Sequence, residues 1–177
     1  MHKIKVYDRE FTKSISSEEI QKQVKRVAEE MNKDLEGKDV IFLGILNGAF
    51  MFASDLMKEI KIDCQITFLK VASYQGTTSS GKVKRLIGIN EDIEGKTVVI
   101  IEDIIDSGIT MDYILKQLRG YEPKEIKIAT LLFKPDAFQK DFDIHYKAIT
   151  IPNDFIVGYG LDYEGFGRNL EDIYTVV

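Results

Sequence analysis

The chain has 177 residues, of which 44% are hydrophobic and 30% charged, and its formal net charge is -5. This length suits one domain with a sizeable core, so we predict that residues 1–177 form a single domain. The composition excludes a disordered chain, and the acidic balance argues against a surface that binds nucleic acid.

The cysteine and histidine content indicates a compartment and excludes a zinc pattern. Cys64 is the only cysteine, so no internal disulfide can form and the chain suits a reducing compartment. His2 and His145 lie far apart without cysteine partners. The N-terminus lacks the apolar run of a secretory signal, and no stretch approaches the roughly 18 apolar residues of a membrane span. We therefore expect a cytoplasmic protein without nucleic-acid or membrane partners.

The first part of the chain predicts helices alternating with strands. Ser16 and Glu19 have the spacing of a capping box, and apolar residues then recur at helical spacing to Leu35, before Gly37. The elements expected next are a buried strand at 40–46, a helix at 49–60 and a strand at 66–72. In that second helix we expect the inward side chains to be Phe50, Leu56 and Met57.

Residues 73–84 break this pattern, because they are polar and include two glycines. Such a segment cannot pack a core, and it predicts a mobile loop or a loose hairpin tip. The elements expected after it are strands at 86–89, 97–101, 127–133, 148–151 and 155–159, and a helix at about 110–118. Alternating strands and helices predict an α/β fold with a mainly parallel central sheet, which binds ligands at the C-terminal ends of its strands.

The most informative segment is 98–110, where the most apolar strand leads into acids, small hydroxyl residues and a helix. Ser107, Gly108 and Thr110 at the start of that helix offer backbone N–H groups, hydroxyl donors and the positive end of the helix dipole. Glycine also lets the backbone approach a ligand closely. We predict that this segment binds a phosphate dianion.

Three acids precede this phosphate cradle. Glu102 and Asp103 lie one step away from it, where they can accept hydrogen bonds from a diol or hold Mg²⁺ through waters. Asp106 lies between the acid pair and the cradle and could face the reacting carbon of a sugar. A phosphate pocket beside a diol-binding acidic pair describes ribose 5-phosphate. A capped helix with solvated acids is the simpler interpretation, but the combination of all these residues favours the functional one.

This segment resembles the phosphoribosyl pyrophosphate (PRPP) motif of the phosphoribosyltransferases, and the segment order from about 40 to 168 is similar to that of hypoxanthine-guanine phosphoribosyltransferases. The resemblance implies a type I phosphoribosyltransferase fold, with a mainly parallel central sheet flanked by helices and a small base-binding hood from the termini. It implies a purine-salvage transferase that converts hypoxanthine or guanine and PRPP to IMP or GMP and pyrophosphate. It also implies Mg²⁺ as cofactor and a homodimer or homotetramer.

The resemblance also implies roles for residues on the sugar-phosphate side. Asp106 is the base that removes the N7 proton of the purine, and Arg168 binds pyrophosphate. The loop Leu46, Asn47 and Gly48 holds pyrophosphate through its backbone, with a cis bond between Leu46 and Asn47. Asn47 replaces the lysine of the family pattern, which removes a cation from the pyrophosphate site. The remaining residues expected to bind the sugar phosphate are Glu102, Asp103, Ile104, Ile105, Ser107, Gly108, Ile109 and Thr110.

On the purine side, the resemblance assigns Lys134 to the 6-oxo group, since an ammonium donates but does not accept. Phe155 would stack on the base, and the backbone near Ile156 and Asp162 would read its 2-position. Asp162 is also expected to join Glu102 and Asp103 as a metal ligand. The loop that begins at Ser73 and Tyr74 would close as a lid and exclude water from an oxocarbenium-like transition state.

Two alternatives stay open. A regulator built on the same fold could keep the motif as a nucleotide sensor, although the acidic balance argues against the basic face it would need. A transferase that prefers xanthine is the nearest rival among enzymes, because backbone groups read the 2-position. The sequence does not fix the order of preference among hypoxanthine, guanine and xanthine. It also does not distinguish a dimer from a tetramer.

Overall fold

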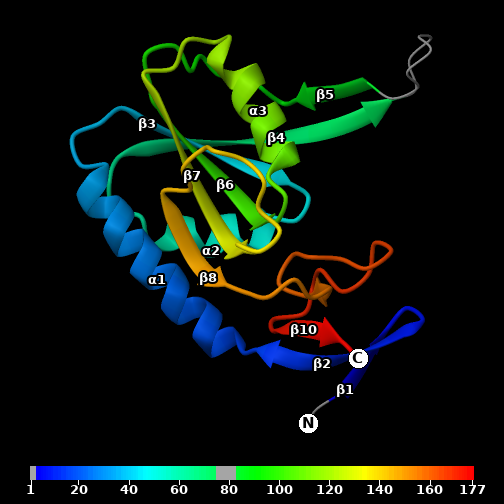
Figure 1. The fold of residues 1–177 in the computed structure, drawn as a ribbon. Helices are drawn as coiled ribbons and strands as arrows, with labels where there is room; N and C mark the ends of the chain where they lie inside the picture. Colours follow the sequence, from blue (N-terminus) through cyan, green and yellow to red (C-terminus); the bar gives the residue numbers. More distant parts are fainter. Residues whose placement is uncertain (1–2, 75–82) are drawn as a thin grey trace.

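The computed structural model describes residues 3–74 and 83–177, which form two sheets and three helices (Figure 1). The larger sheet has the strand order β5-β4-β3-β6-β7-β8, and the smaller has the order β1-β2-β10-β9. The elements are β1 (Lys3–Val6), β2 (Arg9–Ile15), α1 (Ser17–Asp34), β3 (Val40–Leu46), α2 (Phe50–Glu59), β4 (Cys64–Tyr74), β5 (Val83–Ile87), β6 (Thr97–Ile105), α3 (Ile109–Arg119), β7 (Glu125–Phe133), β8 (Tyr146–Thr150), β9 (Ile156–Val157) and β10 (Ile173–Val176).

The larger sheet is the predicted parallel core. Strands β4, β3, β6, β7 and β8 pair in parallel, and only β5 runs antiparallel at the edge. Alternate side chains of β3 face opposite sides: Phe42 packs with α1 and α2, whereas Leu43 packs with α3. Both faces are covered by helices, as Figure 1 shows, which explains the unbroken apolar runs in the sequence. The α/β prediction is confirmed.

Helix predictions hold with small shifts at the ends. The Ser16 hydroxyl caps α1 by accepting the Glu19 N–H at 3.2 Å, as the spacing predicts. The prediction that Phe50 faces inward is wrong, since its side chain is 40% exposed. Helical geometry instead turns another set of α2 side chains onto the sheet, namely Phe52, Ala53 and Leu56, while Met57 is partly buried.

Strand β6 is longer than predicted, because β7 continues to pair with it beyond the apolar run. Glu102 is in register with Thr130, and Ile105 with Phe133. The acid pair therefore lies inside the last part of a strand rather than after it, and the loop begins only at Asp106.

Both ends of the segment predicted as a loop at 73–84 lie in strands. Ser73 and Tyr74 belong to β4, and Val83 already belongs to β5, which ends at Ile87. These two strands pair antiparallel, which supports the hairpin interpretation. Residues 75–82 lie outside the described residues, so the lid stays a prediction.

The smaller sheet is the expected hood, and both ends of the described chain contribute to it. Strand β2 pairs with β1 and β10, and β10 pairs with β9. Only Ile156–Val157 of the strand predicted at 155–159 is in a strand. Gly158, Tyr159 and Gly160 turn the chain instead, with φ angles of 108°, 47° and 96°. Figure 1 shows this hood at the end of the core to which the arrows of β6, β7 and β8 point.

No helix among the described residues is long and apolar enough to cross a membrane.

Candidate active site

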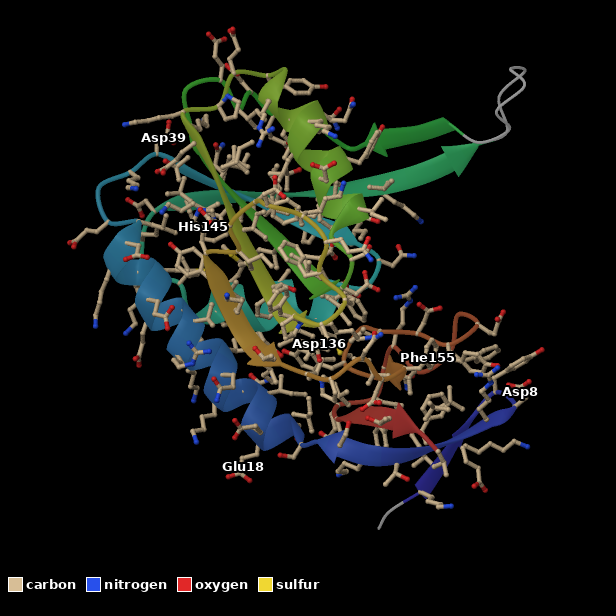
Figure 2. The ribbon with its side chains drawn as sticks, viewed as in Figure 1. Asp8, Glu18, Asp39, Asp136, His145 and Phe155 are labelled. Atoms are coloured by element: carbon tan, nitrogen blue, oxygen red, sulfur yellow. The ribbon has the colours of Figure 1, made fainter. Side chains whose placement is uncertain are left out.

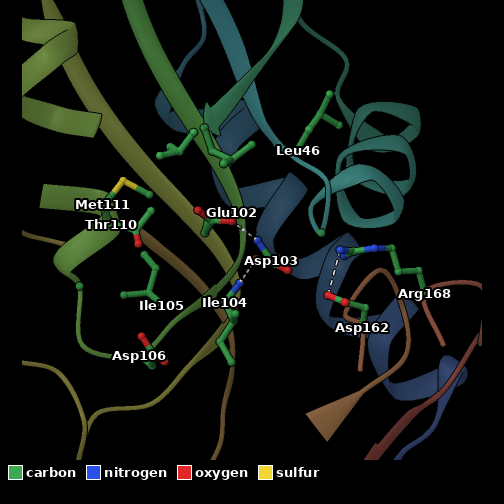
Figure 3. A pocket seen from close by; sticks show the side chains of 14 residues that line it. Leu46, Glu102, Asp103, Ile104, Ile105, Asp106, Thr110, Met111, Asp162 and Arg168 are labelled. Carbon is green, nitrogen blue, oxygen red and sulfur yellow. Dashed lines mark hydrogen bonds and ion pairs between the residues drawn. The ribbon is translucent and has the colours of Figure 1, made fainter. Parts of the chain in front are cut away.

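A cavity of about 460 Å³ opens where the C-terminal ends of β3 and β6 meet the start of α3 and the hood. Figure 3 shows the acid pair of β6 between the start of α3 on one side and Asp162 and Arg168 of the hood on the other. The residues that line the cavity are Ile45, Leu46, Gly48, Val71, Glu102, Asp103, Ile104, Ile105, Asp106, Gly108, Thr110, Met111, Asp162 and Arg168.

The predicted phosphate cradle is a tight turn that precedes α3. Gly108 is the N-cap residue, with a φ of 82° that favours glycine, and its carbonyl accepts the Asp112 N–H at 2.9 Å. The Asp106 carboxylate accepts the Ser107 N–H at 2.6 Å. The positive end of α3 therefore forms part of the cavity wall. A phosphate there would gain backbone donors and a favourable helix dipole. Ser107 and Ile109 do not line the cavity themselves.

The acid pair is poorly solvated. Glu102 is 8% exposed, and its carboxylate accepts the Asp103 N–H at 3.0 Å, while Asp103 accepts the Ile104 N–H at 2.8 Å. Burial, followed by the neighbouring Asp103 charge, raises the pKa of Glu102 well above its usual range. A hydroxyl donor or a cation in the cavity would relieve this unfavourable burial of negative charge.

The residues fit a Mg²⁺ site only if substrate oxygens share in coordinating the ion. Within residues 3–74 and 83–177, no three histidine, cysteine, aspartate or glutamate side chains gather closely enough to hold a metal. Glu102 and Asp103 offer two carboxylates on the cavity wall. Mg²⁺ usually keeps several waters and takes its other ligands from substrate oxygens, so such a pair is suitable. Asp162 lines the same cavity, but its nearest ionic partner is Arg168.

The loop after β3 touches both the core and the hood. The Leu46–Asn47 peptide bond is cis, as the resemblance implies. A Cβ added to Gly48 would lie 1.8 Å from an oxygen of Asp103, and a Cβ added to Gly160 would lie 2.1 Å from the Gly48 carbonyl oxygen. The approach of Gly160 to a backbone carbonyl requires glycine, and a side chain at Gly48 would displace the Asp103 carboxylate. Asn47 does not line the cavity.

Arg168 is fixed by contacts within the hood. One guanidinium nitrogen donates to the Gly160 carbonyl at 2.7 Å, and another lies 2.9 Å from the Asp162 carboxylate (Figure 3). The other oxygen of Asp162 accepts the Gly165 N–H at 2.8 Å. These contacts hold the planar cation at the cavity wall, an arrangement suited to phosphate oxygens.

Of the residues predicted for the purine, Asp162 lines the cavity, whereas Lys134, Phe155 and Ile156 do not. Lys134 follows β7 directly, is 9% exposed and donates to the Asp154 carbonyl at 2.7 Å. Phe155 lies on the hood (Figure 2), 45% exposed, with its ring edge-on to Tyr163 at 5.7 Å. Ile156 is buried in β9. The exposed ring of Phe155 directly follows Asp154, whose carbonyl accepts a hydrogen bond from the Lys134 ammonium. This arrangement is suitable for a flat ligand with polar groups at its edge.

Sequence reasoning missed part of the cavity. Ile45, Val71 and Met111 line it, although none was predicted. Ile45 and Met111 each stand next to a predicted segment, so adjacency could have indicated them, whereas Val71 is brought in by the pairing of β4 with β3. The side chains of Ser73 and Tyr74 lie outside the described residues.

Comparisons with known proteins agree with this geometry. The family model of the phosphoribosyl transferase domain matches residues 13–164. A hypoxanthine-guanine phosphoribosyltransferase of Streptococcus mutans is 40% identical over 168 residues, covering 90% of this chain and 93% of the relative. The solved structure of such an enzyme from Bacillus anthracis is 38% identical, with a TM-score of 0.85 over 94% of this chain and 98% of the other.

A variant hypoxanthine phosphoribosyltransferase of Trypanosoma cruzi, solved as a ternary complex with substrates, is 30% identical, with a TM-score of 0.84 over 93% of this chain and 94% of the other. Family model, relatives and solved structures thus each cover most of the chain. The phosphate cradle and the acid pair lie within the residues that the family model matches. The chain therefore belongs to the hypoxanthine-guanine phosphoribosyltransferase family and is a transferase of the type I phosphoribosyltransferase fold.

Proposed function

We propose that this protein transfers the ribose 5-phosphate group of PRPP to N9 of hypoxanthine or guanine, forming IMP or GMP and releasing pyrophosphate. One observation carries the proposal: a phosphate cradle, a buried acid pair and a fixed guanidinium line one cavity. These three features match the phosphate, the diol and the pyrophosphate of a single substrate. The names of the relatives add the purine as the second substrate.

In this proposal, the start of α3 binds the 5-phosphate through backbone donors and the Thr110 hydroxyl. Glu102 and Asp103 accept hydrogen bonds from the ribose hydroxyls, which relieves the burial of the Glu102 carboxylate. Residues that hold the sugar in line with the attacking nitrogen supply much of the rate acceleration, since a correctly oriented pair avoids the entropic cost of encounter.

Arg168 stabilises the charge that develops on the leaving pyrophosphate, together with the backbone of Leu46 and Gly48. Mg²⁺ bound by pyrophosphate oxygens with Glu102 and Asp103 would supply further charge neutralisation. Asp162 acts first through Arg168, because it orients that guanidinium at 2.9 Å. Asn47 adds no cation here, so Arg168 is the main protein charge on the pyrophosphate side.

Asp106 is the proposed general base for N7 of the purine, because it is an exposed carboxylate at the cavity between the acid pair and the cradle. Lys134 donates to the 6-oxo group and exchanges its present bond to the Asp154 carbonyl for that oxygen. Phe155 stacks on the base, and the backbone near Ile156 and Asp162 reads its 2-position. A 6-amino group would meet the Lys134 ammonium as donor against donor, which disfavours adenine.

We further propose a cytoplasmic homodimer or homotetramer, with the segment 73–84, which begins at Ser73 and Tyr74, as a lid. A cytoplasmic location suits a chain with a single cysteine. A nucleotide-sensing regulator is not favoured, since the relatives are named as transferases.

The test is turnover of PRPP and Mg²⁺ with hypoxanthine, guanine, xanthine, adenine and uracil, following nucleotide and pyrophosphate together. Turnover of hypoxanthine or guanine with little turnover of adenine is the expected result. Preference for xanthine would replace the proposed substrate within the same reaction. Binding of PRPP without turnover of any base would overturn the proposal and revive the regulator.

A further inference from the structure

The phosphate cradle is backed by the segment 135–140, which directly follows Lys134. The Lys134 N–H donates to the Ile105 carbonyl at 3.0 Å, and the Gln139 N–H donates to the Ser107 carbonyl at 3.1 Å. The segment therefore crosses behind the cradle and is hydrogen-bonded to it at both ends.

Between these two hydrogen bonds, the ring of Phe138 rests on Gly108. A Cβ added at Gly108 would lie 2.8 Å from Cε2 of Phe138 and 3.1 Å from Cγ of Lys140. The α-carbon of Gly108 is thus in close contact with an aromatic edge, and Gly108 lines the cavity whereas Phe138 does not. Because Gly108 has the left-handed φ of 82°, the cradle depends on this residue for its shape.

The Phe138 ring is itself fixed by two further phenylalanines. Phe133 lies edge-on to Phe138 with the ring centroids 5.4 Å apart, and Phe142 lies edge-on to Phe138 with the ring centroids 5.2 Å apart. Edge-to-face pairs of this kind define ring orientation. The atoms nearest to a Gly108 Cβ belong to Phe138 and Lys140, so Phe138 is the member of this aromatic series that meets the cradle there.

An apolar wall behind the cradle has a chemical consequence. An aromatic ring offers the backbone no strong hydrogen-bond acceptor, so Phe138 does not compete with a phosphate for the N–H groups at the start of α3. The Ser107 and Ile109 N–H groups bond only to local side chains, the Asp106 carboxylate at 2.6 Å and the Ser107 hydroxyl at 3.4 Å. Donors that are already oriented bind a phosphate dianion without a cost of reorganisation. Lys140 supports the same arrangement at its edge, where its ammonium lies 3.4 Å from Asp112 in the first turn of α3.

We propose that Phe138 is a positioning residue of the 5-phosphate site: it holds the Gly108 turn in its phosphate-binding conformation without touching the substrate. The proposal rests on the proposed function, because it takes the cradle to bind the 5-phosphate of PRPP. It predicts that loss of the Phe138 ring weakens the binding of PRPP more than that of the purine.

The experiment compares Phe138→Ala with Phe142→Ala, a control with the same residue type, the same partly buried class and a place in the same aromatic series. KM for PRPP, KM for hypoxanthine and kcat are measured for each, with thermal unfolding of each protein. Calorimetry of PRPP with Mg²⁺, without purine, measures the donor site alone. Phe138→Leu replaces the alanine variant where that variant does not fold, and Phe138→Tyr retains the ring.

We expect Phe138→Ala to raise KM and Kd for PRPP by about five-fold or more while KM for hypoxanthine changes less than about two-fold. Phe142→Ala should lower the unfolding temperature and leave both KM values near wild type. Phe138→Tyr should recover most of the PRPP affinity. Equal PRPP constants in the two alanine variants, or an equal rise in both KM values for Phe138→Ala, would overturn the proposal.

Failure of the proposed function gives a different result. A wild-type protein that turns over no purine but binds PRPP contradicts the transferase proposal, and the calorimetric comparison of the two variants still decides the role of Phe138. A wild-type protein that binds no PRPP overturns both.

Discussion

The backbone of Gly48 lies against the carboxylate of Asp103, so that a Cβ on Gly48 would stand 1.8 Å from Oδ2 and 2.6 Å from Cγ of that side chain. Gly48 belongs to the loop after β3, and Asp103 to the acid pair of β6. Gly48 belongs to the proposed pyrophosphate subsite and Asp103 to the proposed ribose subsite, so this contact connects the two subsites. Any side chain at position 48 must therefore displace a group that both subsites need.

Gly48→Ala should accordingly lower kcat/KM for PRPP by about 100-fold, the typical cost of moving a substrate-positioning group by about 1 Å. Gly37→Ala is the control, because Gly37 has a φ of 74° and open space around it. That control should cost about 1 kcal/mol of stability and leave turnover unchanged. Steady-state kinetics and urea unfolding of both variants check this prediction, and wild-type kinetics in Gly48→Ala would contradict it.

Arg168→Lys should lower kcat/KM for PRPP by about 10- to 100-fold, because lysine keeps the charge but cannot bridge Gly160, Asp162 and a phosphate with one planar group. Arg26 offers a matched control, since its guanidinium contacts Glu30 at 2.7 Å and a β8 carbonyl at 2.9 Å, away from the cavity. Arg26→Lys should leave turnover unchanged. Comparable kinetics for the two variants would mean that Arg168 has no special role in pyrophosphate binding.

Asp106→Asn tests the general base. The asparagine side-chain oxygen can still accept the Ser107 N–H, so the turn should keep its shape while the basic group is lost. We expect kcat to fall by about 10²- to 10⁴-fold with little change in KM for PRPP. Asp136→Asn is the control and should retain wild-type kcat, because Asp136 (Figure 2) is exposed and does not line the cavity. Retention of most turnover in Asp106→Asn would rule out the base role.

Lys134→Gln tests discrimination at the 6-position. An amide both donates and accepts, so the variant should lose about 100-fold in kcat/KM for hypoxanthine and narrow the preference for hypoxanthine over adenine. Lys147, exposed on β8, serves as the control in Lys147→Gln. The measurement is a competition between the two purines for limiting PRPP. An unchanged ratio of products would contradict the proposed contact with the 6-oxo group.

His145 should make stability depend on pH, at a site away from the hood (Figure 2). Burial, followed by the charge of Lys127, lowers the pKa of His145 below its ordinary value of 6.5, and the neutral ring accepts the Ile128 N–H at 3.1 Å. Because the folded pKa is the lower one, this stabilisation is present above pH 6.5 and is lost as the pH falls through the folded pKa.

Urea unfolding of wild type and His145→Gln at pH 7.5, 6.5 and 5.5 measures this effect, since glutamine stays neutral throughout. The stability advantage of wild type should shrink at the lowest pH. A constant difference between the two proteins across the series would show that His145 titrates alike in the folded and unfolded states.

Much of the core could be predicted from sequence because its signals are local. The run at 40–46 matches β3 residue for residue, and Ser16 caps α1 as its spacing from Glu19 implies. The strand ends were less predictable, because pairing decides them. Thr130 and Phe133 of β7 extend β6 through its acids, and no property of the acids themselves indicates that.

The hood was predictable only through the resemblance. Its strands are short, and each depends on partners far away in the sequence, as in the pairing of Phe11 with Val176. Likewise, Val71 reaches the cavity only because β4 lies beside β3, and the close approach of Gly48 to Asp103 needs both strands in place. Residues adjacent to a motif can be inferred from sequence, whereas residues joined by tertiary contacts cannot.

The pairing of β2 with β10 also sets an order of assembly during synthesis. The acid pair and the phosphate cradle, with the β7 strand and the Phe138 ring that support them, are all synthesised before residue 139, but the hood sheet needs residues 173–176. A chain emerging from the ribosome at about 5–20 residues per second can therefore form the ribose and 5-phosphate subsites before Arg168 and the hood sheet exist. The nascent enzyme would hold a sugar phosphate before it could hold a base.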